Sequence, residues 1–509
     1  MEKQEASDFK KSLSLVIVFT FIAKILGFVR EMLLSLFWGA SGISDAYLIS
    51  QTIPGTIFQF VGVGLTTCFI PIFYKEKKDC GVLSSFKFTN KLLTLVLFFS
   101  LVVNVFVFCF SNFVLRLFAP GFVGDVKKYA IIFTRINITS LFFSSFLYVY
   151  NSLLQAYDKF STVAFSAILY NICLVGAIVL GAKIHIVLLS LFSVLAVLIQ
   201  VLLLLSSVHS LGYHFKLDFY LHDNSIKSFL KLFGPVVLGV SVAELNTLID
   251  RSIASLLVVG GISALTYANS LVQLVQGGLV QPVVSVCYPK ITKAVSYGNH
   301  EEASSLISLF MHILWGLLFP ITAFFFYYCN SITSLFFNRG AFNNEAVSMT
   351  AEALRFYSLG IGFVGFQELL SRLFYSYSDT GTPMKVSVIS LCFNVILNIF
   401  LSNIYGLKGL AIATSLSSMI GFLILYSLSH RKLCNIVKIE FIKIIKVIII
   451  TFVSLFGTVM ISSLLGSHVY VFDLIVQCLL FALFYLGLGT LFKIDAIIFL
   501  KSFVCCTKK

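Results

Sequence analysis

The chain has 509 residues, of which 59% are hydrophobic and 11% are charged. Soluble domains usually carry about 25% charged residues, so this composition excludes a soluble globular protein. The net charge of +14 is spread along the chain and forms no basic patch on a soluble module. A nucleic-acid-binding protein is therefore excluded as well.

Continuous apolar stretches recur from one end of the chain to the other. Each is long enough to cross a hydrocarbon core of about 30 Å as a helix of about 20 residues. We therefore predict an all-α polytopic membrane protein with about fourteen transmembrane helices and no sizeable soluble domain. The expected spans are residues 14–36, 45–73, 88–118, 126–156, 160–182, 184–207, 228–257, 262–291, 302–332, 346–376, 384–404, 407–429, 440–464 and 468–492.

The Lys and Arg residues predict the orientation of the chain in the membrane. The N-terminus, the even-numbered loops and the C-terminus, with the span ends beside them, hold 24 of the 36 Lys and Arg residues. The opposite loops hold five, and the remaining seven lie within spans. Because cytoplasmic loops carry the excess of these residues, both termini are expected in the cytoplasm.

Two halves of the chain resemble each other. Gly-Ile-Ser occurs at residues 42–44 and again at 261–263, in equivalent places of the two halves. Each half has six expected helices, and an even number returns the chain to its starting side, so the repeats have parallel topology. We predict an N-lobe of helices 1–6 over residues 12–207 and a C-lobe of helices 7–12 over residues 228–429.

Three segments lie outside this duplication. Residues 208–227 form a predicted cytoplasmic linker, residues 440–492 form two extra helices, and residues 493–509 form a basic cytoplasmic tail. Two six-helix lobes around a central cavity predict transport by alternating access, in which one lobe rocks against the other. The alternative is a duplicated scaffold that transports nothing.

Charged residues inside the spans are the best pointers to a functional site, because a charge within the bilayer is costly unless it is paired or hydrated. Lys24 and Arg30 lie on the first expected helix, and Arg251 lies on the seventh. A hydrated site formed by these cations would suit an anionic group. Phosphate fits best, because guanidinium binds it through two parallel hydrogen bonds.

Internal pairing is the alternative for Arg30 and Arg251. The acidic candidates are Glu31 and Asp45 for the first, and Asp250 and Glu244 for the second. Arg30 and Glu31 are adjacent in sequence, so they are not expected to face one narrow stripe of their helix.

A cation site is a further hypothesis. Asn394 and Asn398 stand four residues apart on the eleventh expected helix, and Thr414 lies on the twelfth. Together with Glu244 they offer oxygen atoms, which hard cations prefer as ligands. Hydrogen bonding between helices is the simpler explanation of the same residues.

Two spans contain residues that soften a helix: Pro54 and Gly55 in the second, and Gly277, Gly278 and Pro282 in the eighth. Such helices line the substrate path in transporters, and ordinary small-residue packing explains them equally well. The chain has no GxxxxGK[ST], HExxH or GxSxG motif, whose chemistry would indicate an enzyme. We therefore expect a transporter.

Several short motifs carry a family resemblance. Residues 23–31 read Ala-Lys-Ile-Leu-Gly-Phe-Val-Arg-Glu, and residues 119–122 read Ala-Pro-Gly-Phe. Residues 336–342 contain Phe-Asn-Arg-Gly-Ala-Phe, and residues 374–385 contain Asp-Thr-Gly-Thr-Pro. In order and spacing these motifs resemble those of the lipid II flippases, the MurJ/MviN family, over residues 12 to about 430.

The resemblance implies the multidrug/oligosaccharidyl-lipid/polysaccharide flippase superfamily, with fourteen helices and two lobes around a cationic cavity. It implies that lipid II, an undecaprenyl-pyrophosphate-linked muropeptide, moves from the inner to the outer leaflet of the bacterial cytoplasmic (inner) membrane for peptidoglycan synthesis. It also implies a coupling ion, sodium or proton, or the membrane potential in place of ATP. The last two helices would form a groove for the lipid tail. Membrane lipids and proteins of cell division or peptidoglycan synthesis are the implied partners.

Family positions carry over onto this chain residue by residue. The implied substrate-binding residues are Lys24, Arg30, Glu31, Asp45 and Ser263, to which we add Arg251. The implied sodium ligands are Asn394, Asn398 and Thr414, with Glu244 added from the spans.

At three places this chain departs from the family pattern, and the departures lower the positive charge expected in the cavity. Lys24 stands where the family usually has Arg, which removes the bidentate geometry. The arginine of the second helix falls near residues 58–59, and an arginine and an acid of the eighth helix fall on Ser270 and Gln273. We hypothesise that Arg251 compensates.

Two other functions remain open. A relative in the same superfamily could move another polyprenyl-linked saccharide or export an organic cation, although a cation exporter should have an acidic cavity and the first helix here is basic. A membrane scaffold of cell-wall synthesis could bind the lipid precursor without moving it.

Overall fold

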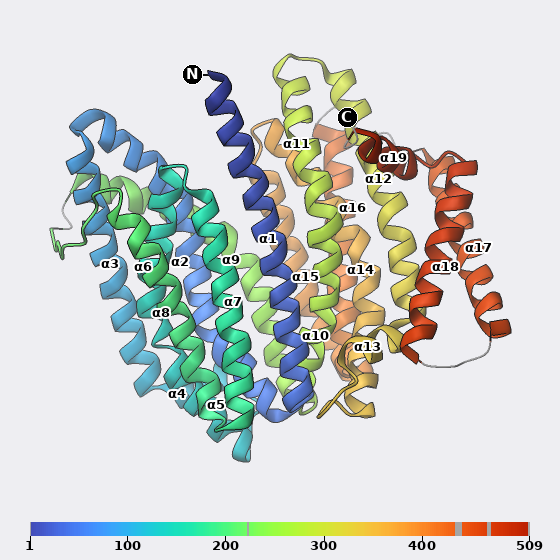
Figure 1. The fold of residues 1–509 in the computed structure, drawn as a ribbon, viewed down its shortest axis with the longest axis horizontal. Helices are drawn as coiled ribbons and strands as arrows, with labels where there is room; N and C mark the ends of the chain where they lie inside the picture. The colour runs from blue at the N-terminus through green and yellow to red at the C-terminus, as the bar shows by residue number, and fades with distance from the viewer. Residues whose placement is uncertain (1, 221–222, 433–439, 466–469, 507–509) are drawn as a thin grey trace. The chain divides into compact units, whose positions relative to one another are not determined.

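The computed structural model describes residues 2–220, 223–432, 440–465 and 470–506. Parts of three predicted segments, the linker, the last helix pair and the tail, lie outside the described residues, at 221–222, 466–469 and 507–509. Within the described ranges the chain forms nineteen α-helices and one π-helix, with no strand (Figure 1). The prediction of an all-α membrane protein is confirmed.

Packing between helices divides the chain into two compact units, residues 1–263 and 264–509. The division falls after the predicted linker, because α9 (Asn224–Leu257) packs along α2 (Gly42–Cys80) and so joins the first unit. The two predicted lobes rest on the internal repeat rather than on packing, and they stay a prediction.

The first unit is built around α2. Its other helices are α1 (Glu2–Trp38), α3 (Val82–Cys109), α4 (Ser111–Phe118), α5 (Gly124–Asn137), α6 (Ser140–Ala156), α7 (Phe160–Lys183) and α8 (Val187–His209). Helices α3, α5, α6 and α9 all pack against α2, while α1 packs on α7 and α7 on α8. This arrangement surrounds the polar residues of α2 with helices on several sides.

The second unit contains the remaining helices. They are α10 (Gly261–Val275), which begins at the end of the first unit, the π-helix η1 (Gln276–Val280), α11 (Gln281–Ser296), α12 (His300–Tyr327), α13 (Cys329–Phe337), α14 (Asn344–Ser376), α15 (Gly381–Tyr405), α16 (Leu407–Lys432), α17 (Phe441–Leu465), α18 (Tyr470–Leu491) and α19 (Asp495–Cys506). Helix α14 packs on α12 and α16, and α12 also contacts α17 and α19. The last three helices are therefore attached to the unit through α12.

The number of membrane-spanning segments agrees with the prediction of about fourteen. Ten helices among the described residues are long and apolar enough to cross a membrane, or eleven if α5 and α6, bent by 42°, form one span. Helices α1, α9 and α14 have 37, 34 and 33 residues and carry charged residues within their length. These three complete the expected number.

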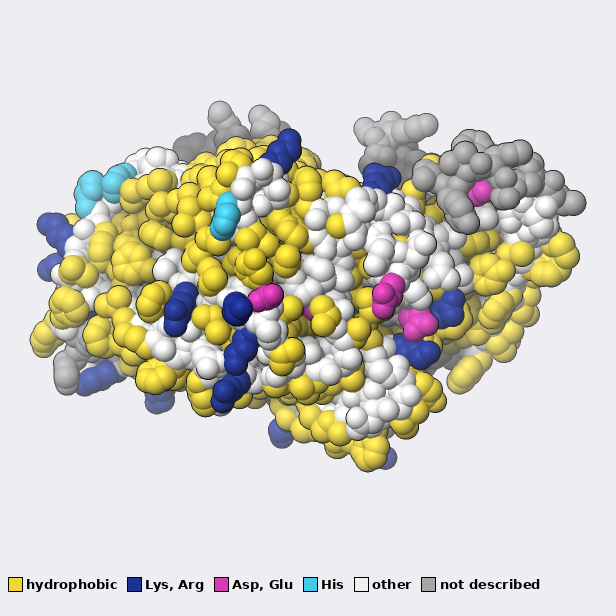
Figure 2. Space-filling view, turned by 90° about the horizontal axis from the view of Figure 1, so that it is seen from below, with side chains coloured by type: hydrophobic (Ala, Val, Ile, Leu, Met, Phe, Trp, Pro, Cys, Tyr) yellow, Lys and Arg dark blue, Asp and Glu magenta, His cyan; other side chains and the backbone are white. Residues whose placement is uncertain are grey.

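Large apolar side chains face outward on many of these helices. On α3 they include Phe98, Leu101, Val105 and Phe108, all about half exposed. Hydrophobic side chains also cover much of the face seen in Figure 2. In water such a surface would be unfavourable, whereas lipid tails solvate it, so the surface fits a membrane protein.

Capping residues fix where several helices begin. Ser41 and Ser44 form a reciprocal capping box at the start of α2. Asn299 caps α12 through the backbone N–H of Glu302, and Asn343 caps α14 through that of Ala346. These side chains satisfy N–H groups that have no partner within the helix.

The contact between α15 and α16 gives the first prediction. A Cβ atom on Gly409 would lie 2.2 Å from the Leu401 carbonyl oxygen, a backbone atom that cannot move aside alone. Gly409→Ala should therefore lower the free energy of unfolding by about 2 kcal/mol, as overpacking usually does. Thermal unfolding of the purified protein in detergent measures the effect.

Gly487→Ala on α18 is the matched control, because nothing lies within 4 Å of its added Cβ. It should leave the melting temperature unchanged. Equal melting temperatures for the two variants would contradict the close approach of α15 and α16.

Candidate functional site

The first candidate site residues, Arg30 and Glu31, form an ion pair on α1. Arg30 donates through Nη2 to Glu31 Oε1 at 2.6 Å. The Arg30 side chain is 25% exposed and the Glu31 side chain 8% exposed. The internal pairing considered as the alternative is therefore found for Arg30, with Glu31 rather than Asp45 as its partner, because the long arginine side chain reaches across to its neighbour.

Only one oxygen of Glu31 takes part in this pair. Its Oε2 atom is buried and has no hydrogen-bond partner among the described residues. A buried carboxylate oxygen without a donor is costly, so water or a ligand group is the natural partner for this atom.

A polar network adjoins the Arg30–Glu31 pair. The Tyr47 hydroxyl lies 2.8 Å from Ser193 Oγ and accepts a hydrogen bond from Gln51 Nε2 at 2.5 Å. The hydrogen bonds of this network link α2 to α8, and Tyr47 and Tyr170 lie near Arg30 of α1.

A cavity of about 320 Å³ lies within the first unit. Its polar lining residues are Gln51, Asn137, Ser140, Ser144, Tyr148, Tyr170, Ser193 and Gln200. Phe58 and Tyr148 stack on its wall with ring centroids 5.5 Å apart. The lining offers hydroxyl and amide groups and contains no charged residue, so it suits water or a neutral polar ligand.

Pro54 and Gly55, which the sequence analysis singled out as helix-softening residues, also line this cavity. Its polar lining residues were missed, because sequence reasoning followed charges and helix-softening residues in the first six spans. A usable signal was present. Gln51 and Gln200 are amide residues inside otherwise apolar spans, and Asn137 ends α5 in a similar setting. Buried polar groups of this kind need partners, so they too indicate where an interior polar site lies.

Lys24 is exposed on α1, one and a half turns before Arg30. It forms no ion pair with any described acidic residue. Its predicted role in substrate binding stays a prediction.

Asp45 and Ser263 are brought together at the start of α10. Asp45 accepts from Ser263 N, Ser263 Oγ and Gly260 N, each at 2.7 Å, and its side chain is fully buried. A carboxylate at a helix N-terminus satisfies the free N–H groups and the helix dipole. Asp45 therefore pairs with backbone and hydroxyl donors rather than with Arg30.

The same junction requires a glycine. Gly260 has φ +86°, and a Cβ there would lie 2.2 Å from the Ala40 carbonyl oxygen. In addition, Ser44 Oγ donates to Ser263 Oγ at 3.2 Å. The Gly-Ile-Ser segments that revealed the repeat, residues 42–44 and 261–263, therefore contact each other directly.

Arg251 on α9 donates through Nη1 to the Thr52 hydroxyl on α2. Glu244, half-buried two turns earlier, interacts electrostatically with it. Arg251 thus lies against α2. Its contact residue Thr52 stands three residues before Gly55, which lines the cavity. The structure attaches Arg251 to the same helix as Gln51.

In the second unit, Asn394, Asn398 and Thr414 form a hydrogen-bonded cluster. Asn398 Nδ2 donates to Asn394 Oδ1 at 2.7 Å, and Asn394 Nδ2 lies 3.4 Å from both Thr414 Oγ1 and Ser417 Oγ. Their side-chain oxygens are uncharged ligands of the kind that hard cations such as sodium bind. The residues therefore have suitable ligand atoms for such an ion. Glu244 belongs to the other unit, and the four-residue sodium site stays a prediction.

The eighth expected span departs from a regular α-helix at Gly277 and Gly278, the residues from which we predicted a softened helix. Residues 276–280, which include Gly277 and Gly278, form the π-helix η1 between α10 and α11. π-Helical turns are rare and occur frequently at functional sites. Gln276 at its start donates to the Ile361 carbonyl at 3.2 Å, which ties the turn to α14.

A polytopic helical bundle with a buried ion pair beside a polar cavity is typical of a membrane transporter. Solved structures agree on the fold. The lipid II flippase MurJ in an inward closed conformation matches with a TM-score of 0.84 over 95% of this chain and 99% of that chain, at 23% identity. A multidrug resistance MATE family transporter of the MOP superfamily, in an inward-facing conformation, matches with a TM-score of 0.70 over 81% of this chain and 95% of that chain, at 13% identity.

Sequence comparisons define the family. The family described as lipid II flippase MurJ matches residues 34–485. The probable lipid II flippase MurJ of Buchnera aphidicola subsp. Baizongia pistaciae is 31% identical over 432 residues, which cover 84% of this chain and 83% of the relative. That of Rickettsia prowazekii is 27% identical over 418 residues, which cover 81% and 82%. This chain belongs to the lipid II flippase MurJ family.

The Asp45 junction gives the second prediction. Asp45→Asn keeps the shape of the side chain but replaces a charged acceptor of three hydrogen bonds by a neutral amide, one end of which is itself a donor. The free energy of unfolding should fall by about 2 kcal/mol, the range for hydrogen bonds to charged groups. Thermal unfolding in detergent measures the change.

Asp125→Asn is the matched control, because Asp125 pairs with Lys128 on the exposed surface of α5. Such exposed pairs contribute little to stability. The melting temperature of this variant should therefore equal that of the wild type. Equal melting temperatures for Asp45→Asn and Asp125→Asn would contradict the stabilising role of Asp45.

Proposed function

We propose that this chain moves lipid II from the inner to the outer leaflet of the cytoplasmic membrane. Membership of the lipid II flippase MurJ family along residues 34–485 supports the substrate. The absence of catalytic motifs from the sequence is in keeping with a transporter rather than an enzyme. The supply of a peptidoglycan precursor is the cellular role that follows.

The observation that carries this proposal is the Arg30–Glu31 pair. Glu31 holds the guanidinium at 2.6 Å through one oxygen, and Arg30 keeps 25% of its side chain exposed. Guanidinium has five N–H donors in a planar fork, so donors remain for an anionic group. The pyrophosphate of lipid II has the matching charge and geometry.

The neighbouring cavity supports the same substrate. Its hydroxyl and amide lining suits the uncharged sugar and peptide groups beside a pyrophosphate. Movement would follow alternating access between the two predicted lobes, driven by an ion gradient or by the membrane potential. The π-helix η1 and Pro54 within α2 supply helices that bend at low cost.

The third prediction tests Arg30 in a bacterium depleted of its resident lipid II flippase. Wild-type chain should restore lipid II at the outer leaflet, and Arg30→Gln should lower it at least ten-fold. A double variant, Arg30→Gln with Glu31→Gln, separates substrate binding from pairing. It removes both charges, so neither remains buried alone. If Arg30 binds substrate, the double variant stays inactive.

Arg116→Gln is the control, because Arg116 is exposed at the end of α4. It should restore lipid II fully, and membrane levels of all variants should be compared by immunoblot. Full activity of the double variant would show that Arg30 serves only to neutralise Glu31. No rescue by inserted wild-type chain would indicate another polyprenyl-linked saccharide or a scaffold.

The fourth prediction concerns Arg251, which we propose replaces the cationic residues missing from the second and eighth helices. Arg251→Ala should lower lipid II at the outer leaflet at least ten-fold in the same assay. Thr52→Val removes its hydrogen-bond partner and leaves the charge, and this variant should retain most activity. Full activity of Arg251→Ala would refute the replacement.

A further inference from the structure

A small basic pocket lies in the second unit, at the beginning of α17 and the end of α18. It encloses about 70 Å³, and its polar lining residues are His312 and Trp315 of α12, Lys443 and Lys446 of α17, Lys493 in the turn before α19, and Asp495 at the start of α19. By the orientation predicted from Lys and Arg, this end of the helices lies at the cytoplasmic surface of the membrane.

The charges around this pocket do not balance. Lys443 lies 3.1 Å from Asp495 and 2.9 Å from Glu440, so both nearby acids share one lysine. Lys446 and Lys493 have no acidic side chain within ion-pair distance among the described residues. Two ammonium groups therefore line the pocket without a counter-charge.

A further donor is buried at the same place. The Trp315 Nε1 atom is inaccessible and has no hydrogen-bond partner among the described residues. Buried Trp N–H groups usually find an acceptor. Lys493 also adopts a left-handed backbone conformation, with φ 52°, which residues with a Cβ rarely adopt. The pocket thus presents the unused donors of Trp315, Lys446 and Lys493 beside one carboxylate, Asp495, whose ion-pair partner is Lys443.

Trp315 also lines a second cavity of about 300 Å³, which is almost wholly apolar. Its ring stacks on Phe319 at 5.1 Å and on Phe366 at 5.8 Å, and both of these rings line the second cavity. Leu359 and Met419 close it from α14 and α16. A donor-rich pocket and an apolar cavity therefore meet at one tryptophan.

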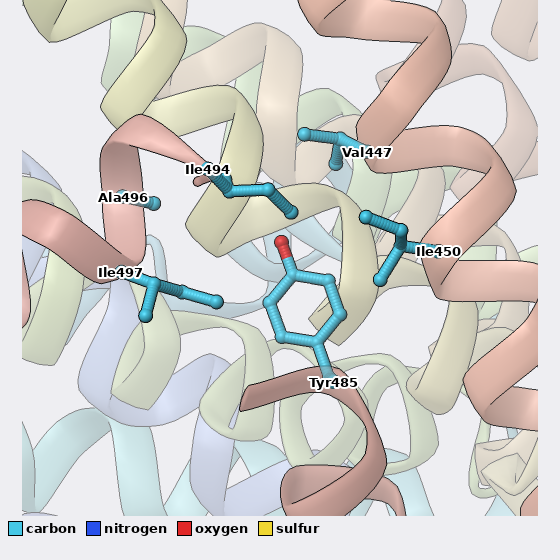
Figure 3. Packing of buried hydrophobic residues seen from close by; sticks show 6 residues of the cluster. All are labelled: Val447, Ile450, Tyr485, Ile494, Ala496 and Ile497. Carbon is cyan, nitrogen blue, oxygen red and sulfur yellow. The ribbon is translucent and has the colours of Figure 1, made fainter. Parts of the chain in front are cut away.

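The helices that form the pocket are packed firmly together. Val447, Ile450, Tyr485, Ile494, Ala496 and Ile497 form a buried cluster that joins α17, α18 and α19 (Figure 3). The Tyr485 hydroxyl donates to the Gly316 carbonyl of α12 at 2.5 Å, next to Trp315. The pocket is thus a preformed feature of the fold.

We propose that this module binds one anionic glycerophospholipid of the surrounding membrane. Its phosphate lies between Lys446 and Lys493 and accepts from Trp315 Nε1, and one acyl chain enters the apolar cavity. A zwitterionic lipid fits less well, because its ammonium group would find both acids already paired with Lys443. Basic pockets between helices at the cytoplasmic side are suited to such head groups.

The proposed occupant differs from the transported lipid. The pocket of about 70 Å³ takes a phosphate group between lysines, and no arginine of the described residues lines it. The site is also separate from Arg30 and its cavity, which belong to the other unit. This inference therefore does not depend on the proposed function.

The fifth prediction uses tryptophan fluorescence of the full chain in detergent. The sequence has only two tryptophans, so Trp38→Phe leaves Trp315 as the sole reporter. Phosphatidylglycerol with brominated acyl chains should quench Trp315, and brominated phosphatidylcholine should bind about ten-fold more weakly. Adding Lys446→Ala and Lys493→Ala should abolish this ten-fold preference, since the two lysines together supply the positive charge that favours a head group of net negative charge.

Lys385→Ala is the matched control, because Lys385 is an exposed lysine of the same unit outside the pocket. It should keep the preference for phosphatidylglycerol. Gly362→Leu should reduce maximal quenching, because its side chain would fill the apolar cavity, where the only atom near an added Cβ is Phe366 Cε2 at 3.6 Å.

Four results would overturn the proposal. Equal quenching by the two brominated lipids would show that the site does not prefer an anionic head group. An unchanged preference in the double lysine variant would show that the head group does not bind at Lys446 and Lys493. Displacement of the brominated lipid by a polyprenyl pyrophosphate at lower concentration than by phosphatidylglycerol would assign the site to the transported lipid. Inorganic phosphate should not displace the lipid at millimolar concentration, and displacement by it would refute an acyl-chain contribution.

Discussion

A charge or an unpaired polar group inside a hydrocarbon core costs several kcal/mol unless a partner meets it. The polar architecture of the first unit follows from this constraint. Arg30 pairs with its sequence neighbour Glu31, Arg251 with a hydroxyl of α2, and Asp45 with the N-terminus of α10. The first pair lies within α1, whereas Arg251 reaches from α9 to α2 and Asp45 reaches from α2 to the start of α10.

The Arg30–Glu31 pair is well suited to transient recognition of a phosphate. Glu31 neutralises the guanidinium through one hydrogen bond, so an empty site carries no isolated buried charge. Because Arg30 keeps further donors, an anionic group can add to the pair rather than break it. The uncharged cavity beside it accepts water when the site is empty, which also lowers the cost of burying the pair.

The two units handle polar groups differently. The buried carboxylates Glu31, Asp45 and Asp250 all lie in the first unit. In the second unit the buried polar contacts between helices are neutral, such as the Asn394–Asn398–Thr414 cluster and the Gln276 contact to α14, and the ion pairs are partly exposed. The cations of our second proposal lie at the beginning of α17, where a membrane would supply anionic head groups.

The amino-acid sequence by itself determined the fold class, the number of spans and the family, because long apolar runs have only one stable form in a bilayer and the motifs keep their order along the chain. It also indicated Arg30, Glu31, Asp45 and Ser263 as residues of interest. The sequence left Glu31 and Asp45 as alternative partners of Arg30, and the structure has the local pair with Glu31. Asp45 instead accepts from backbone donors of Gly260 and Ser263, which no side-chain pattern reveals and which only tertiary structure brings near. The cavity of Gln51, Tyr170 and Gln200 and the junction of two cavities at Trp315 arise only when distant helices pack, since neutral polar residues carry no signal of where their neighbours lie.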